Sequence, residues 1–388
     1  MKEKKHYTAT ICLTHRCNLK CVYCFQKHDS IHKMSFKTAK DCINSIFRNF
    51  TTDYDGIEIS FIGGEPLLEF DLIKQIFEYT TDILKPQIKY SFFISTNGTI
   101  LSEDMKKWFR ERKDKICLGL SLDGTKETHN DNRSNSFELI DLDFFRRNWQ
   151  NQNIKMTLSE KSLYNFADNI KYVHSLGFGI NGADLSEGFF DWSDEKYLKT
   201  LIPQMQELVK FYTKNDNLVK FNRLFDKDLA SCATKNKYRR KSCGTGNSII
   251  FFDTDGKTYP CSYITPMTFS QLEIVEILKV DFNNNECFID EDCYQNCYIY
   301  PICNTCAGAN YLTNKDLKER DKRKCKIRKL LVLFIADLQA KLIIKNPKIY
   351  DDVKLYYTIE AIKKIRELYL EQFEIYFTHK SERTKSDF

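Results

Sequence analysis

Short apolar segments recur through the first half of the chain and alternate with longer segments of helical periodicity. The short segments are rich in β-branched and aromatic residues, which is typical of parallel strands buried on both faces. The expected strands are residues 7–13, 57–62, 90–96, 116–122, 154–158 and 178–184. The expected helices are residues 36–50, 72–84, 103–110, 137–150 and 163–176.

This alternation predicts an α/β fold. A series of strand–helix units favours either a right-handed parallel barrel or an open doubly wound sheet. In both architectures, chemistry collects at the loops that follow the carboxyl ends of the strands. Side chains directly after each expected strand are therefore the first candidates for function.

The pattern divides the chain into four expected regions. Residues 1–185 carry the strand–helix series, and residues 186–230 form a helical connector with one long helix at 197–213. Residues 231–330 are rich in cysteine and turn residues, with a short hairpin expected at 249–252 and 257–259 around an Asp-Gly turn. Residues 331–388 continue with helices at 330–344 and 356–377.

Composition and charge exclude several classes of protein. A net charge of +6 in 388 residues is too small for a dedicated nucleic-acid binder. The N-terminus lacks the apolar stretch of a signal peptide, and no apolar run approaches the roughly 20 residues that span a bilayer. We therefore expect a cytoplasmic protein without membrane or nucleic-acid partners. In that reducing compartment, an odd total of 15 clustered cysteines indicates metal binding and not disulfides.

A cysteine triplet follows the first expected strand. Cys17, Cys21 and Cys24 have C-x3-C-x2-C spacing. Three thiolates on one loop can each hold an iron of a cubic iron–sulfur cluster, which leaves the fourth iron open to bind a ligand. A zinc loop with a distant fourth ligand is the alternative, although zinc sites more often use paired C-x2-C units.

Polar and glycine-rich motifs follow the next three expected strands. Gly-Gly-Glu-Pro occupies residues 63–66, Ser-Thr-Asn-Gly residues 95–98, and Ser-Leu-Asp-Gly residues 121–124. Each motif alone is typical of a turn. Their coincidence at successive strand ends predicts one shared site.

With the cysteine triplet, these motifs resemble the radical S-adenosylmethionine (SAM) superfamily over residues 7–185. The resemblance implies a partial (β/α)6 TIM-like barrel and two cofactors, SAM and a 4Fe-4S cluster held by Cys17, Cys21 and Cys24. It also implies that one electron from the cluster cleaves SAM to a 5′-deoxyadenosyl radical, which abstracts hydrogen from the substrate.

The resemblance further implies which side chains bind the cofactors. Glu65, with Gly63 and Gly64, would meet the SAM amino group, and Arg133 would meet its carboxylate. The remaining expected cofactor contacts are Tyr23, which precedes the third cysteine, and the strand-end residues Ser95, Asn97, Ser121 and Asp123.

A second cysteine group lies between residues 232 and 325. Its nine cysteines exceed the eight needed for two fully ligated 4Fe-4S clusters, and structural zinc is the alternative. The group resembles the SPASM extension of peptide-modifying radical SAM enzymes, which implies two auxiliary 4Fe-4S clusters. The ligands implied for the first are Cys243, Cys261, Cys306 and Cys232, and for the second Cys293, Cys297, Cys303 and Cys325, with Cys287 unassigned.

Three further cysteines, Cys12, Cys42 and Cys117, occupy apolar strand or helix positions. We expect them to be core residues.

Resemblance to SPASM enzymes suggests a maturase that acts on a ribosomally made precursor peptide and forms a thioether or carbon–carbon crosslink. An electron donor such as flavodoxin or ferredoxin is also expected. Anaerobic sulfatase maturation is the alternative, but those enzymes carry an aspartate base where this chain has Ser262. An alternative of another class is a non-enzymatic electron carrier or a zinc-stabilised binding protein.

Basic stretches at residues 235–241 and 315–329 border the cluster cysteines. Such stretches are usually solvated surface. The alternative hypothesis is that these basic residues offset the negative charge of the clusters or hold an acidic leader peptide.

Overall fold

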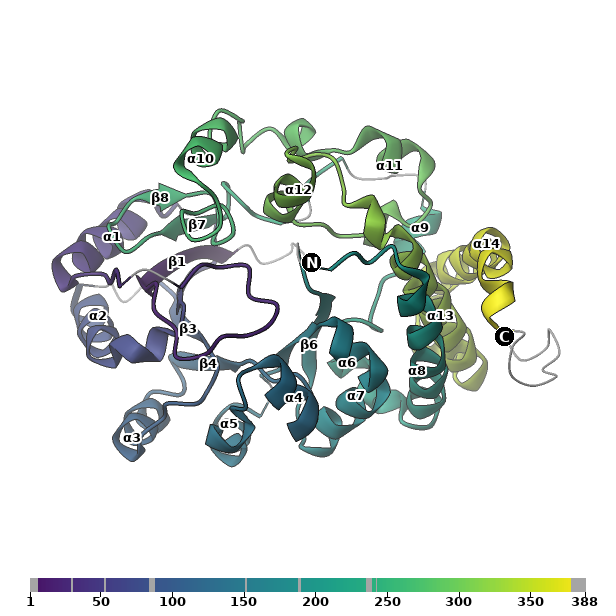
Figure 1. Cartoon of the computed structure of the whole chain (residues 1–388), viewed down its shortest axis with the longest axis horizontal. Coiled ribbons are helices and arrows are strands. Elements are labelled where there is room, and N and C mark those ends of the chain that lie inside the picture. The colour runs from purple at the N-terminus through teal and green to yellow at the C-terminus, as the bar shows by residue number, and fades with distance from the viewer. Residues whose placement is uncertain are drawn as a thin grey trace. The chain divides into compact units, whose positions relative to one another are not determined.

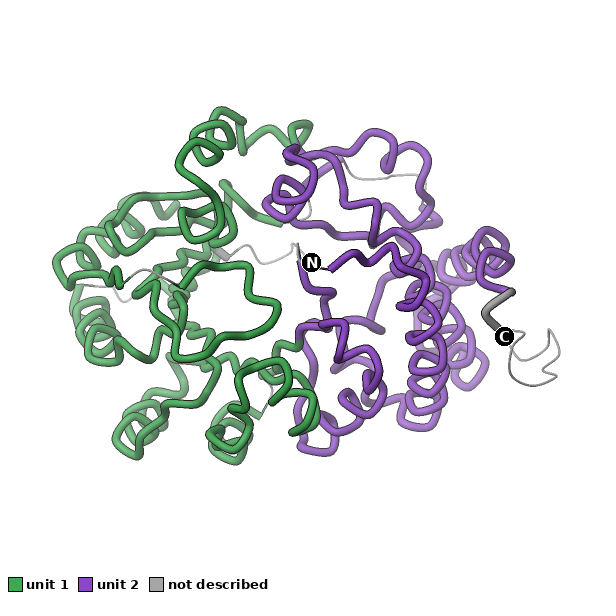
Figure 2. Tube along the Cα trace, viewed as in Figure 1, with its two compact units in different colours: residues 1–156, 243–287 green, residues 157–242, 288–388 purple. Residues whose placement is uncertain are grey.

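The computed structural model describes residues 6–28, 31–51, 54–83, 88–150, 152–187, 190–234, 239–241 and 243–377. It groups the chain into two compact units, each made from two separate segments (Figure 2). Unit 1 comprises residues 1–156 and 243–287, and unit 2 comprises residues 157–242 and 288–388. The two units are defined by which residues lie close together in space, whereas the four expected regions were defined by sequence motifs. The four regions therefore stay a prediction.

Unit 1 is built on a mixed sheet whose strand order is β4-β3-β2-β1-β7-β8 (Figure 1). Strands β1 to β4 are neighbours in chain order and all run parallel, which confirms the predicted α/β class. The strands of the protein are β1 (His6–Thr14), β2 (Gly56–Gly63), β3 (Tyr90–Thr96), β4 (Ile116–Leu120), β5 (Ile154–Leu158), β6 (Ile180–Leu185), β7 (Ile249–Phe252) and β8 (Thr258–Tyr259).

The predicted hairpin from the cysteine-rich region completes this sheet. Strand β7 pairs in parallel with β1, from Thr8 opposite Ile249 to Ile11 opposite Phe252. Strand β8 then returns antiparallel through a turn at Gly256, whose φ of 82° favours glycine. The pairing of β7 with β1, which lies more than 200 residues earlier in the chain, was not predicted from sequence.

Helices of unit 1 bury their apolar stripes against the sheet. Helix α1 begins after Ser35, whose side chain caps the Thr38 amide, and buries Ile43 and Ile46. Strand residues such as Ile59 and Phe92 supply the other side of the core. The unit 1 helices are α1 (Phe36–Asn49), α2 (Phe70–Ile83), α3 (Glu103–Glu111), α4 (Lys126–Asn132), α5 (Leu142–Asn148) and α10 (Gln271–Ile277).

Unit 2 is mainly helical. Strand β5 includes residue 156, where the chain passes from unit 1 to unit 2, and it pairs with β6 in a two-stranded sheet. The long helices α8 and α13 pack against each other. The helices are α6 (Glu160–Tyr164), α7 (Phe166–Ser175), α8 (Glu195–Lys214), α9 (Ala230–Ala233), α11 (Glu291–Asn296), α12 (Ala307–Asn314), α13 (Cys325–Lys345) and α14 (Asp352–Phe377). Within the described part of the chain, none of these helices has the length and apolarity needed to cross a bilayer.

Two predicted helices are wrong in their continuity. The segment 137–150 divides into a 3-10 turn at Phe137–Leu139 and helix α5, because Asp141 caps the new helix through the Phe144 amide. The segment 163–176 lies across the break between α6 and α7 at Asn165. The predicted helix 72–84 corresponds to α2, and its last residue lies outside the described residues.

Core packing around Phe92 gives a test of this fold. Phe92 on β3 is 1% exposed, and its ring centroid lies 5.6 Å from that of Phe61 and 5.4 Å from that of Phe77. Phe92→Ala is expected to destabilise the protein by about 3–5 kcal/mol, because the lost ring leaves a cavity. Urea denaturation followed by circular dichroism measures this change in the free energy of unfolding. Phe221→Ala, at a position 39% exposed, is the control and should cost about 0.5 kcal/mol or less.

Candidate active site

The cysteine triplet lies in the loop after β1, on unit 1. Cys17, Cys21 and Cys24 are half-buried free thiols, and Tyr23 between the last two is buried. Because the carboxyl ends of β1 to β4 meet at one edge of the parallel sheet, this loop lies beside the ends of the other three strands. The predicted convergence of the strand-end motifs with the triplet is tested by the contacts below.

Backbone of the Gly-Gly-Glu segment contacts the cysteine loop directly. The Gly64 amide donates to the Thr14 carbonyl at 3.0 Å, and the Glu65 amide donates to the Arg16 carbonyl at 2.8 Å. A Cβ on Gly64 would lie 2.1 Å from the Arg16 carbonyl oxygen. The sequence places these glycines beside the expected SAM amino group, where glycine would allow a ligand to approach the backbone closely. In the structure, the neighbour that requires glycine at position 64 is the backbone of the loop itself.

The Glu65 carboxylate joins the end of β2 to the end of β3. Its Oε1 accepts from the Thr96 hydroxyl at 2.8 Å and from the Leu67 amide at 3.1 Å. Its Oε2 accepts from the Asn97 amide at 2.8 Å. Burial raises the pKa of Glu65 to about 7, although these hydrogen bonds act in the opposite direction.

Asn97 carries the connection onward to the loop. Its side-chain amide donates to Asn18 Oδ1 at 2.9 Å, and the Asn18 amide donates to the Thr99 hydroxyl at 2.8 Å. Asn18 was not among the predicted site residues. Its position directly after Cys17 is the signal that could have identified it.

A buried ionic network fixes the other end of the loop. Arg133 Nε donates to Asp123 Oδ2 at 2.9 Å, and its Nη2 donates to Oδ1 at 3.3 Å. The Tyr23 hydroxyl also donates to Asp123, and Asn132 Nδ2 donates to it at 3.2 Å. The Val22 amide reaches the Asn132 carbonyl at 3.0 Å. Arg133 and Asp123, which were both predicted to face SAM, therefore also neutralise each other.

The remaining predicted contacts, Ser95 and Ser121, lie half-buried at the ends of β3 and β4, and the Ser121 amide donates to the Thr96 carbonyl at 3.0 Å. The cofactor roles assigned to all these residues stay predictions. What the structure adds is that side chains of the three strand-end motifs reach the cysteine loop or the residues that hold it.

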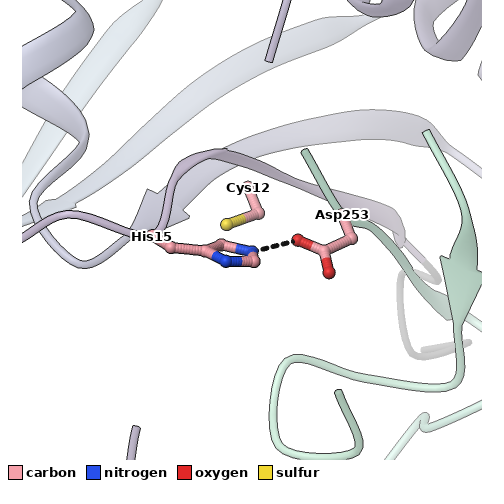
Figure 3. Close-up of side chains that lie close together, drawn as sticks. All are labelled: Cys12, His15 and Asp253. Atoms are coloured by element: carbon pink, nitrogen blue, oxygen red, sulfur yellow. Dashed lines mark hydrogen bonds and ion pairs between the residues drawn. The ribbon is translucent and has the colours of Figure 1, made fainter. Parts of the chain in front are cut away.

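A second buried group supports the start of the loop (Figure 3). His15 Nε2 lies 2.6 Å from Asp253 Oδ1, and both side chains are buried together with Cys12. The His15 carbonyl faces His28 Nδ1 at 3.0 Å, and His28 Nε2 lies 3.2 Å from Cys24 Sγ. Sequence reasoning missed Asp253, because no local spacing links residues 238 positions apart. It also missed His28, although its position four residues after Cys24 is a signal that could have identified it.

The surroundings of the three thiols differ. Burial raises the pKa of Cys17 to about 11 and also raises that of Cys21. Burial acts in the same direction on Cys24, but contact with His28 and a backbone amide outweighs it and lowers its pKa. Metal binding requires thiolates, so these protons must leave when a cluster is bound.

Spacing of the sulfurs bears on which metal group fits. Among the described residues, those grouped tightly enough to share one ion, with ligand atoms within 4.8 Å of one another, do not include the triplet. Thiolates around one zinc ion lie about 2.3 Å from the metal and so within that range of each other. At least one pair of these three sulfurs is therefore more than 4.8 Å apart in the described structure, a spacing that an iron–sulfur cluster accommodates.

Comparison with known proteins agrees with this geometry. Residues 11–142 match the radical SAM superfamily. This segment is a radical SAM domain, and the protein is an enzyme. It is not a non-enzymatic electron carrier or a zinc-stabilised binding protein, and the family's cofactors are SAM and iron–sulfur clusters.

Two curated relatives extend the similarity beyond the radical SAM domain. A cysteine-type anaerobic sulfatase-maturating enzyme of Clostridium novyi is 28% identical over 74% of this chain and 83% of its own length. The antilisterial bacteriocin subtilosin biosynthesis protein AlbA of Bacillus subtilis is 25% identical over 68% of this chain and 56% of its own length. The protein is thus a maturase-type radical SAM enzyme, related to both groups.

Solved structures share the fold. The protein anSMEcpe with bound AdoMet superposes with a TM-score of 0.64 at 18% identity, over 92% of this chain and 100% of that chain. Its complex with AdoMet and the Cp18Cys peptide gives a TM-score of 0.59 at 18% identity, over 92% and 99%. At this identity the likeness supports the architecture, including that of the cysteine-rich region.

The second predicted set of auxiliary ligands lies within unit 2. Cys293 is on α11, Cys297 ends that helix, Cys303 follows a 3-10 turn, and Cys325 begins α13. Electrostatic interactions of the Cys325 thiol with those of Cys303 and Cys297 place the three in one neighbourhood. As with the triplet, no three of the four have their sulfurs within 4.8 Å of one another in the described structure.

The other cysteines have mixed outcomes. Cys243 and Cys261 belong to unit 1, whereas Cys232 and Cys306 belong to unit 2, so the first auxiliary cluster stays a prediction. Cys287 is half-buried and still unassigned. Cys12 and Cys42 are core residues as predicted. Cys117 is not, because it is half-buried and its thiol donates to Gln152 Oε1 at 3.2 Å.

Gly64→Ala tests the packing of the loop. The added methyl group would overlap the Arg16 carbonyl, a backbone group that cannot rotate away, so the loop must move. We expect loss of the iron held by the triplet, measured as iron content and cluster absorbance after anaerobic reconstitution. Gly182→Ala is the matched control, since its Cβ would meet only the movable Asp184 carboxylate at 2.9 Å. Equal iron content in both variants would contradict the role given to Gly64.

Proposed function

We propose that this protein is a radical SAM/SPASM peptide maturase that forms a thioether or carbon–carbon crosslink in a ribosomally made precursor peptide. The observation that carries the proposal is the cysteine loop held against the ends of β2, β3 and β4. The similarity to sulfatase-maturating enzymes and to AlbA supports a peptide as the substrate. The peptide-bound structure of anSMEcpe supports it as well.

In this proposal, Cys17, Cys21 and Cys24 hold the cluster that binds SAM. When bound and reduced, the cluster and SAM supply the one-electron chemistry that abstracts hydrogen from the substrate. Glu65 accepts from the SAM ammonium with the lone pairs left free by its three backbone and hydroxyl partners. Arg133 donates to the SAM carboxylate with the N–H groups that Asp123 does not use.

The formation of a thioether balances in atoms and electrons. One S–H and one C–H bond of the peptide break, and one S–C bond forms. The bound cofactors would take up one hydrogen atom, and the second would leave as a proton and an electron. A cluster held by Cys293, Cys297, Cys303 and Cys325 would supply an acceptor for that electron.

Sulfatase-type maturation is the second candidate. The similarity to the Clostridium novyi enzyme over most of its length favours it. Against it stands Ser262, which follows Cys261 where those enzymes carry an aspartate, because a serine hydroxyl is a poor base without a partner. The two candidates predict different products from the same peptide.

A mass measurement distinguishes them. The reconstituted enzyme is incubated with SAM, a flavodoxin or dithionite as electron donor, and the small peptide encoded beside its gene. We expect the peptide to lose two hydrogens per crosslink and to resist fragmentation within the ring. A peptide that instead becomes reactive to aldehyde reagents has been converted to formylglycine. Formation of 5′-deoxyadenosine with an unchanged peptide would contradict the crosslinking proposal. The control is the Cys17→Ala variant.

The raised pKa of Glu65 predicts that SAM binding depends on pH. With a pKa of about 7, the carboxyl is mostly neutral below that pH and charged above it. Only the charged form attracts an ammonium, so affinity should rise about tenfold from about pH 6 to about pH 8. Equilibrium dialysis of the reconstituted enzyme measures it. Glu65→Gln should bind weakly at every pH, whereas Glu69→Gln, on the next turn, should behave as wild type. A steep pH slope that persists in Glu65→Gln would exclude Glu65 as its source.

A further inference from the structure

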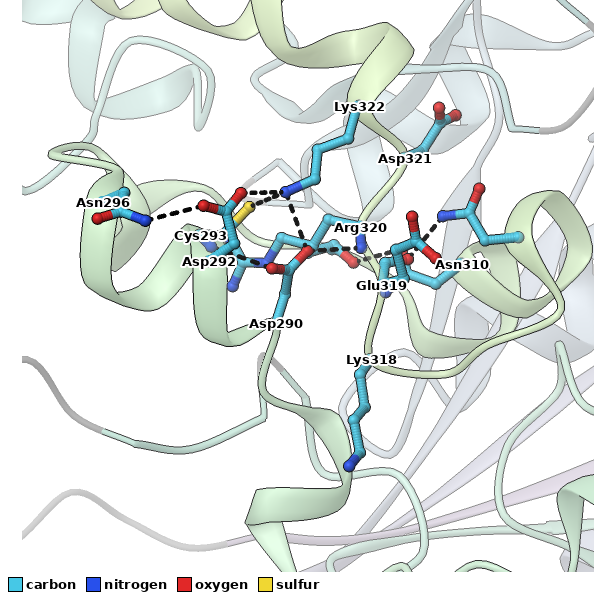
Figure 4. A network of polar contacts seen from close by, with 12 residues as sticks. Asp290, Asp292, Cys293, Asn296, Asn310, Lys318, Glu319, Arg320, Asp321 and Lys322 are labelled. Carbon is cyan, nitrogen blue, oxygen red and sulfur yellow. Dashed lines mark hydrogen bonds and ion pairs between the residues drawn. The ribbon is translucent and has the colours of Figure 1, made fainter.

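Two cations on unit 2 direct hydrogen bonds at cysteine sulfurs. Lys322 Nζ donates to Cys293 Sγ at 3.0 Å (Figure 4). Arg328 Nη1 donates to Cys303 Sγ at 3.4 Å. Both cysteines belong to the set assigned to the second auxiliary cluster. The two cations lie in the basic stretch 315–329, for which solvated surface and charge compensation were both open.

Lys322 is held in place by carboxylates. Its Nζ lies 3.3 Å from Asp290 Oδ2 and 3.1 Å from Asp292 Oδ2. Asp290 also fixes the cysteine, because its Oδ1 accepts from the Cys293 amide at 3.0 Å. One buried carboxylate thus positions both the donor and the acceptor of the Lys322–Cys293 contact.

The surroundings of Cys303 are equally well defined. Arg320 Nη1 donates to the Cys303 carbonyl at 2.8 Å, and the Arg320 guanidinium lies 4.1 Å from the centroid of the Tyr300 ring. The Arg320 amide in turn donates to Asp290 Oδ2 at 3.0 Å. Arg328 lies three residues after Cys325, in the first turn of α13. The donors are therefore part of the same framework as the ligands.

Hydrogen bonds to cluster sulfurs act on reduction potential. Reduction adds negative charge to a cluster, and a positive donor at a ligating sulfur stabilises the reduced form more than the oxidised form. Arg328 is half-buried, whereas the Lys322 side chain is 44% exposed and faces two carboxylates. Arg328 should therefore have the larger effect, because solvent and the carboxylates offset the charge of Lys322.

We propose that Lys322 and Arg328 raise the reduction potential of the second auxiliary cluster and so make it the acceptor of the electron left after hydrogen abstraction. They act on the cluster through their hydrogen bonds to Cys293 and Cys303. The inference rests on the proposed function for the presence of a cluster at Cys293, Cys297, Cys303 and Cys325.

The test is a potentiometric titration followed by electron paramagnetic resonance. A Cys17→Ala/Cys21→Ala/Cys24→Ala background removes the SAM-binding cluster from the spectrum. Further substitution of Cys297 and Cys325 by Ala identifies the signal of the second auxiliary cluster by its loss. Lys326→Gln is the matched control. Lys326 has the same charge, lies between Lys322 and Arg328 in the sequence, and pairs with Glu195 at 3.7 Å.

Arg328→Gln should shift the midpoint potential of that signal to more negative values, and Lys322→Gln should shift it less in the same direction. Arg328→Lys, which keeps the charge and a donor, should recover part of the shift. Lys326→Gln should leave the potential unchanged. If Arg328→Gln lowers iron content, the exposed Lys322 position still gives the measurement.

The outcomes separate this inference from the proposed function. If Arg328→Gln and Lys322→Gln keep the wild-type potential while the signal is present, the tuning role is wrong and the cluster assignment stands. If substituting Cys297 and Cys325 changes neither iron content nor signal, no cluster is bound there, and both the assignment and the tuning role are wrong.

Discussion

The main-chain contact between the cysteine loop and the end of β2 is the interaction on which the site depends. Gly64 and Glu65 donate to Thr14 and Arg16, and the close approach of Gly64 leaves no room for a side chain. A loop with three thiols has many conformations in isolation. These contacts select one of them before any metal is bound, because two adjacent amides and two carbonyls define both the distance and the direction of the loop. The Glu65 carboxylate then extends the same constraint to β3.

Charge is used in opposite ways in the two units. Unit 1 buries the carboxylates of Glu65 and Asp123 next to the cysteine loop, and Arg133 neutralises the second of them. A buried acid with a raised pKa suits a cationic ligand such as the sulfonium and ammonium of SAM. Unit 2 instead surrounds its cysteines with Lys322, Arg320 and Arg328, which suits an anionic group with four thiolates and no free position. In the proposed function, this contrast corresponds to one cluster that binds SAM and another that accepts an electron.

Much of this could be predicted from sequence because it is local. All six expected strands match the observed ones to within two residues at each end, and the motif at each strand end identified Glu65, Asn97 and Asp123. Contacts between distant segments could not be predicted. The parallel pairing of β7 with β1 and the His15–Asp253 contact join segments separated by more than 200 residues. The break in the segment 137–150 was missed because the side chain of Asp141 overrides an otherwise continuous apolar pattern.

Protonation links cluster assembly to folding of these surroundings. Burial raises the thiol pKa values of Cys17 and Cys293 to about 11, so the metal-free protein holds neutral thiols in half-buried or buried positions. Neutral thiols are tolerated there because they need little solvation. Thiolates are tolerated only once iron or a cation replaces the lost water. Lys322 already lies at Cys293, and His28 at Cys24, where they can offset part of that charge. At Cys293, the residue proposed to tune the cluster, Lys322, is thus also the cation that offsets the charge of the thiolate before the cluster is assembled.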